Sequence, residues 1–78
     1  METSTFDERL KALAAITGSW KHSDAWSAEY EQMLKEVKAD TDRARRYAQA
    51  DRLRRLMDHQ LEFMLNTWVA ESRRQGMN

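Results

Sequence analysis

The fold is decided by residues 23–75, which read SDAWSAEYEQMLKEVKADTDRARRYAQADRLRRLMDHQLEFMLNTWVAESRRQ. This stretch has no glycine and no proline, and its apolar side chains recur every three or four residues. That spacing places them along one side of an α-helix. The stretch therefore predicts an all-α protein, in which the residues before and after it form a lead-in and an end.

The apolar spacing does not keep one register along this stretch. The first seam consists of Trp26, Tyr30, Met33 and Val37, and strict continuation takes it through Asp40, Ala44 and Tyr47. The second seam consists of Tyr47, Ala50, Arg54, Met57, Leu61, Met64 and Trp68. Both have the alternating steps of a coiled coil. They meet through two consecutive steps of three residues, which indicates either an overwound helix or a break.

A break has a candidate position at Ala39-Asp40-Thr41-Asp42. Three of these four residues are good helix N-caps and poor residues for a helix interior. We therefore expect a turn at 39–42, which folds a helix over 24–39 back, antiparallel, on a long helix over 43–75. Without the turn, residues 24–75 form one rod of roughly 78 Å at 1.5 Å per residue, and a rod of that length needs a partner chain.

The segment 43–75 carries a second apolar stripe. Leu56, Phe63 and Ala70 lie on one line, roughly 120° around the helix from the Met57–Trp68 seam at 100° per residue. A helix with two apolar faces needs two neighbours. The chain's own helices cover one face, and a second copy is the simplest cover for the other, so we expect a homodimeric helical bundle. The residues expected in the core or the dimer seam are Tyr47, Leu56, Met57, Leu61, Phe63, Met64 and Trp68.

The residues before this stretch predict a short helix and a loop. Thr5-Phe6-Asp7-Glu8 matches a capping box, so a helix is expected over 5–17. Gly18 supplies the left-handed residue that closes this helix. The loop 18–23 ends at Ser23, which is expected to cap the next helix. The chain is then a single small domain over 1–78.

Length and composition limit the possible functions. Seventy-eight residues bury only a modest core. The absence of cysteine excludes disulfides, thiolate metal sites and thiol nucleophiles. No apolar run approaches the roughly 20 residues of a membrane span, and the acidic N-terminal residues lack the pattern of a signal peptide. These features predict a soluble, cytoplasmic protein that does not bind membranes.

The sequence predicts no enzyme, no cofactor and no metal site. His59 and Glu62 share a helix face, but di-iron bundles repeat Glu-x-x-His and add further Glu, whereas here the order is reversed and occurs once. His22 lies in the loop beside Lys21 and Asp24, which is a common surface setting. The chain also lacks a glycine-rich phosphate loop and a Gly-x-Ser-x-Gly motif.

The charges are divided unevenly along the chain although the net charge is zero. Residues 1–42 hold nine acids and five bases, and residues 43–78 hold four acids and eight bases. The simpler interpretation is that the two halves pair with each other. The alternative is that each half binds an oppositely charged partner.

An arginine-rich segment raises the second functional hypothesis, a nucleic-acid-binding dimer. Its possible phosphate contacts are Arg43, Arg45, Arg46, Arg52 and Arg55. At 100° per residue these side chains spread around the helix, which favours pairing with acids of the first half. Arg54 occupies a seam position, where a pair with Asp40 is conceivable and solvation at the edge of the seam is the alternative.

Two tryptophans lie around the loop, and tryptophan is strongly enriched at interface hot spots. Trp26 lies on the first seam, which favours burial, whereas Trp20 lies off the seam, which favours exposure. The residues predicted to contact a protein partner are Trp20, Lys21, Trp26 and Tyr30.

The stretch Leu13-Ala14-Ala15-Ile16-Thr17-Gly18-Ser19-Trp20-Lys21, with the acid-rich sequence that follows to Asp40, resembles the toxin-neutralising tail of VapB-type antitoxins. In that family the tail wraps a PIN-domain ribonuclease. It places a tryptophan in an apolar groove and a basic side chain near the acidic active site. The resemblance implies that Trp20 is the anchor and Lys21 the basic probe. It covers residues 13–40, and the long arginine-rich helix has no counterpart in it.

Together these patterns favour a non-enzymatic helical protein that acts as a homodimer and binds and modulates a protein partner, by inhibition or neutralisation. By analogy, small, neutral helical dimers of this kind are typical of inhibitors, antitoxins and phage-encoded regulators. The alternatives are the nucleic-acid-binding dimer and an oligomerisation element without a further target.

Overall fold

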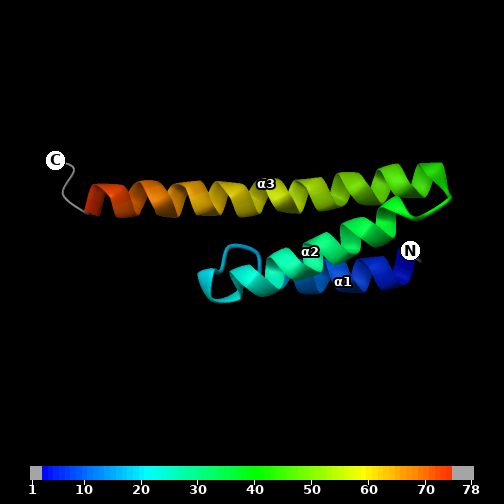
Figure 1. Ribbon diagram of the computed structural model, residues 1–78, viewed down its shortest axis with the longest axis horizontal. Helices are drawn as coiled ribbons and strands as arrows, with labels where there is room; N and C mark the ends of the chain where they lie inside the picture. The colour runs from blue at the N-terminus through cyan, green and yellow to red at the C-terminus, as the bar shows by residue number, and fades with distance from the viewer. Residues whose placement is uncertain (1–2, 75–78) are drawn as a thin grey trace.

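The computed structural model describes residues 3–74 and contains three α-helices joined by one 3-10 turn and a short loop (Figure 1). The elements are α1 (Thr3–Ala15), η1 (Trp20–His22), α2 (Ser23–Lys38) and α3 (Arg43–Arg74). No strand occurs within this described range. The prediction of an all-α protein is confirmed.

The helices are packed as a short pair against one long helix. After a tight turn, α3 runs back antiparallel to α2. α1 lies beside α2 along the same part of α3 (Figure 1). α3 has 32 residues, which corresponds to about 48 Å at 1.5 Å per residue. The whole molecule measures 53 × 20 × 15 Å, so α3 sets its length. The last turns of α3 project beyond the loop between α1 and α2 (Figure 1).

α1 lies two residues earlier than the predicted 5–17. It begins at Thr3, so Thr5 lies inside the helix and the predicted capping box at Thr5 is wrong. After Ala15 the chain tightens into turns, because the backbone N–H of Thr17 bonds the carbonyl of Ala14 at 3.2 Å. Gly18 then adopts the left-handed conformation, with φ of +81°, as the sequence predicts.

The start of α2 also differs from the prediction. Ser23 has helical backbone angles and is the first residue of α2, so it does not act as the cap. The preceding residue, His22, makes no side-chain capping bond. The turn η1 instead runs directly into α2, so the backbone hydrogen bonds of the turn are continued by those of the helix. α2 ends at Lys38, one residue before the predicted end, and Arg43 begins α3 as expected.

A buried carboxylate forms the turn between α2 and α3. Asp40 is only 7 % exposed, and its side chain accepts bonds from the backbone N–H of Asp42 at 2.9 Å and from the guanidinium of Arg45. Asp42 in turn accepts the backbone N–H of Arg45 at 3.0 Å and so caps α3. The Arg45 guanidinium and the Asp42 N–H hold the pKa of Asp40 far below its usual range. The chain therefore breaks at 39–42 and does not form a rod.

The core lies where the three helices meet. Its buried apolar side chains are Phe6, Leu13, Trp26, Met33, Val37 and Leu53. Trp26 stacks on Tyr30 with ring centroids 5.1 Å apart, and its indole N–H donates to Thr17 Oγ1 at 2.9 Å. The side-chain oxygen of Gln60 on α3 accepts the backbone N–H of Gly18 at 2.9 Å. These two hydrogen bonds hold the loop against both neighbouring helices.

Ion pairs join α1 to the two other helices. Arg9 donates to Glu29 at 2.6 Å and to Glu36 at 2.7 Å, so one guanidinium bridges two turns of α2. These bonds raise the pKa of Arg9, and the bond from Arg9 lowers the pKa of Glu36. Arg52 of α3 pairs with Asp7 of α1. The Arg52–Asp7 pair is of the kind predicted between the basic second half and the acidic first half.

We predict that Gly18→Ala lowers the free energy of unfolding by about 1 kcal/mol, because an L-residue is strained at positive φ. The added Cβ lies 3.6 Å from the ring of Phe63, which is ordinary contact, so the loss comes from the backbone. Gly18→Asn should lose less, because asparagine tolerates this conformation better. Urea unfolding measures all three chains, and equal stability of wild type and the alanine variant contradicts the assignment.

We also predict that the stability difference between wild type and Asp40→Asn depends on pH. The folded-state pKa of Asp40 lies below its ordinary value of 3.8. Its carboxylate therefore stabilises the fold at neutral pH, and this contribution is lost as the pH falls below about 4. Thermal unfolding from pH 7 to pH 3 should show a large gap that narrows on acidification. Glu31→Gln, at an exposed position of α2, is the control and should cost less at pH 7.

Candidate interaction surface

The structure shows which apolar face of α3 the chain covers itself. The side chains that turn toward α1, α2 and the loop are buried or half-buried, and they are Gln49, Leu53, Leu56, Gln60, Phe63 and Thr67. This face contains the stripe of Leu56 and Phe63. The face of the Leu61–Met64–Trp68 seam remains in solvent, with exposed fractions from 36 % for Met64 to 67 % for Trp68. The chain therefore leaves the seam uncovered from Leu61 onward, whereas Ala50 and Met57 of the same seam pack against the core.

The uncovered seam and its neighbours form one surface, which we call the terminal apolar surface. Its members are Trp20, Leu61, Met64, Leu65, Trp68 and Val69. Five of them lie on the last turns of α3, and Trp20 joins them from η1. Their exposed area is on the order of 600 Å², which reaches the upper end of the largest apolar patches on typical monomers. Such patches mark binding surfaces.

The terminal apolar surface is hollowed. A pocket of about 290 Å³ is lined by Trp20, Leu61, Met64, Leu65, Trp68 and Glu71. Trp20 forms its wall on the side of the loop, because the ring rests on Phe63 with centroids 5.6 Å apart. The turn η1 and Gly18 position this ring, so the loop contributes a side chain that the sequence of α3 alone does not supply.

The predicted partner contacts fall into two groups. Trp20 is 51 % exposed and Lys21 beside it is exposed, so both are accessible. Trp26 is 2 % exposed and lies in the core, so its prediction as a partner contact is wrong, although burial matches its place on the first seam. Tyr30 is half-buried against Trp26, and this burial raises the pKa of its phenol. Of the four predicted partner contacts, the exposed ones are therefore Trp20 and Lys21, which are neighbours in η1.

The predicted seam residues are also divided by the structure. Leu61, Met64 and Trp68 lie on the terminal apolar surface, and Leu56, Met57 and Phe63 are half-buried within the chain. Tyr47 lies apart at the start of α3, 59 % exposed, with the guanidinium groups of Arg43 and Arg46 within 6 Å of its ring centre. Leu65 and Val69 belong to the surface although the seam omits them. Their spacing of four from Leu61 is the sequence signal that identifies them.

Most of the predicted nucleic-acid contacts are engaged within the chain. Arg45 bonds Asp40, Arg52 bonds Asp7, Arg55 bonds Asp51, and Arg46 donates to the carbonyl of Asp40. Arg54 bonds Asp51 at 2.9 Å and Asp58 at 3.0 Å, so it does not pair with Asp40 within the chain. The bond from Arg54 lowers the pKa of Asp51, and that carboxylate raises the pKa of Arg54. These arginines therefore do not converge on one open cationic face.

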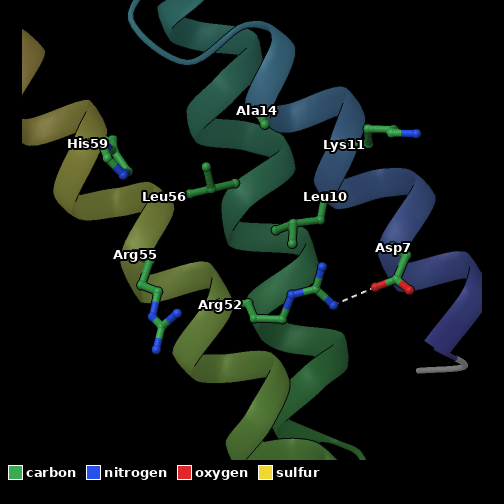
Figure 2. Close-up of a pocket in the computed structure, with 8 residues that line it drawn as sticks. All are labelled: Asp7, Leu10, Lys11, Ala14, Arg52, Arg55, Leu56 and His59. Atoms are coloured by element: carbon green, nitrogen blue, oxygen red, sulfur yellow. Dashed lines mark hydrogen bonds and ion pairs between the residues drawn. The ribbon is translucent and has the colours of Figure 1, made fainter.

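A second concave surface lies between α1 and α3. It has a volume of about 540 Å³, and Leu10, Ala14 and Leu56 supply its apolar part. Leu10 and Leu56 point toward one another across it, and the Arg52–Asp7 pair crosses it at one end (Figure 2). Lys11 points away on the outer side of α1 (Figure 2). Because five of its eight lining residues are charged or polar and Arg52 and Arg55 are already paired, this groove is the weaker candidate for a binding surface.

Within residues 3–74, no group of three histidine, cysteine or acidic side chains is placed to hold a metal ion, and His59 and Glu62 form no such group. In the same range no helix has the length and apolar character to cross a membrane. No protein-family model, curated protein or solved structure matches the chain. The geometry of the chain itself therefore carries the functional argument.

We predict that Trp26→Ala lowers the free energy of unfolding by about 3–5 kcal/mol, because it removes a fully buried ring from the core. Tyr47→Ala, which removes a ring that is 59 % exposed, should cost less than about 1 kcal/mol. Chemical unfolding of both variants checks this. A loss for Trp26→Ala no larger than that for Tyr47→Ala contradicts the assignment of Trp26 to the core.

Proposed function

We propose that this protein is a non-enzymatic interaction protein that assembles with a copy of itself and, in that form, binds and modulates another protein. The observation that carries the proposal is the terminal apolar surface. Two tryptophans and four aliphatic side chains on it are each between 36 % and 67 % exposed. Removing such area from water is favourable at about 25 cal/mol per Å², so a polypeptide that covers it gains stability.

The composition of this surface supports protein as its ligand. Tryptophan and methionine are enriched at protein interfaces, and hot spots cluster where such side chains meet a pocket. Trp20 and Trp68 both line the pocket of about 290 Å³. Lys21 adds an exposed cation at the loop edge beside Trp20, which suits an acidic site on the modulated protein. In this arrangement Trp20 and Lys21 keep the roles of anchor and basic probe that the resemblance to antitoxin tails implies for them.

The charge pattern supports a protein partner over nucleic acid. Phosphate binding needs several unpaired cations on one face, whereas Arg45, Arg52, Arg54 and Arg55 each bond a carboxylate of the same chain. A nucleic-acid partner would have to displace these carboxylates one by one. The net charge of zero over the whole sequence also provides no long-range attraction for a polyanion.

The proposal predicts partner capture that depends on the terminal apolar surface. Immobilised wild type is compared with Leu65→Asp/Trp68→Ala in extracts of the native cell, and Tyr47→Ala, exposed but outside the surface, is the control. One protein should be retained by wild type and the control and lost, by tenfold or more, from the double variant. Stoichiometric addition of the wild-type chain to that purified protein should then change its activity. Identical capture by all three baits, or a partner whose activity does not respond, contradicts the proposal.

A further inference from the structure

We propose that the terminal apolar surface is covered by the same surface of a second copy, with the two α3 helices antiparallel and the pocket of each chain closed over by the other. This inference rests on the proposed function and names the polypeptide that covers the site. It makes the closed pocket a composite of two chains, because one chain lines it and the other covers its open side.

The size of the surface fits a pair of chains. The exposed area of its six residues is on the order of 600 Å² per chain, and a standard stable interface buries about 800 Å² per partner, of which a little over half is apolar. One copy therefore offers most of the area that a stable interface buries. The last turns of α3 also project beyond the loop between α1 and α2 (Figure 1). An isolated stretch of helix is marginal alone.

The surface is complementary to itself. Trp68 is its most exposed large side chain, at 67 %, and lines the pocket together with Trp20, Leu61 and Leu65. In a twofold pair each contact occurs twice, so a surface that is apolar along its length can pack on its own copy. The side chains of α3 in this surface lie on one face of the helix, which is the requirement for a closed dimer.

The charges beside the surface favour the antiparallel arrangement. At 100° per residue, Glu62 and Arg73 lie along the same edge of the exposed stripe. When two helices pair antiparallel about a twofold axis, equal edges face each other. Arg73 of one chain then lies opposite the segment of Glu62 in the other, twice per dimer. A parallel pair instead brings Arg73 and Arg74 of both chains to the same end, together with both negative helix ends.

Sedimentation equilibrium tests the assembly. Wild type and Tyr47→Ala should sediment as two chains at micromolar concentration. Leu65→Asp/Trp68→Ala should dissociate at least tenfold more readily, because it places a charge at the centre of the apolar contact. Circular dichroism must show that the double variant keeps its helices. A wild-type mass of one chain at 100 μM, or an unchanged dimer in a folded double variant, overturns the inference.

Cross-linking tests the orientation, and the chain is suited to it because it has no cysteine. Asp58→Cys and Ser72→Cys are made as separate chains. An antiparallel pair centred between Leu65 and Trp68 brings position 58 of one chain near position 72 of the other, and separates identical positions by roughly 15 Å or more at 1.5 Å per residue. A short bismaleimide should therefore link the mixed chains at least fivefold more than either chain alone. Efficient linking of each variant to itself indicates a parallel pair and overturns the antiparallel arrangement.

The two proposals fail separately. A monomeric wild type that still captures and modulates a partner through Leu65 and Trp68 rejects the self-assembly in both proposals and retains only the partner binding. A dimer with the expected cross-links but no captured protein retains the pairing and rejects the modulating role.

Discussion

The carboxylate of Asp40 is the constraint on which the arrangement of the chain depends. It is buried at the end of α2, bonds the backbone N–H of Asp42 and receives the guanidinium of Arg45. A buried carboxylate needs such partners to remain charged, and here the partners come from the residues that start α3. The same bonds that satisfy the charge therefore end one helix, begin the next and fold α2 back along α3. Without this turn, α2 would continue into α3 and Trp26, Met33 and Val37 would not face Leu53.

A mismatch of lengths follows from the turn. α1 and α2 have 13 and 16 residues and lie beside each other, whereas α3 has 32. Two short helices that lie side by side cover one face of α3 along part of its length. The last turns of α3 therefore project beyond the two short helices. Their exposed seam lies on another face of α3 than the one that α1 and α2 cover, so its apolar side chains stay in solvent.

The loop contributes more than a connection. Gly18 allows the backbone to reverse at positive φ, Gln60 holds its N–H, and Trp20 consequently reaches Phe63 on α3. The surface thus combines a rigid helix with one ring carried on a loop that is bonded in place. Such a site is largely preorganised, which lowers the entropic cost of binding. The ion pairs of Arg9, Arg52 and Arg54 lie away from its apolar centre and keep the rest of the surface polar.

Local sequence signals are sufficient for the helices, for the turn at 39–42 and for the left-handed Gly18, because apolar spacing, N-cap residues and glycine act over a few neighbouring residues. They are also sufficient to show that α3 has two apolar faces. They do not give the starts of α1 and α2. Thr5 and Ser23 have side chains that suit a helix cap, but in the folded chain both residues have helical backbones and belong to the helices. Nor do they decide which face of α3 the chain buries or that Arg45, rather than Arg54, pairs with Asp40. Those outcomes depend on how two short helices pack on a long one, and packing of that kind exists only after the turn has brought distant residues together.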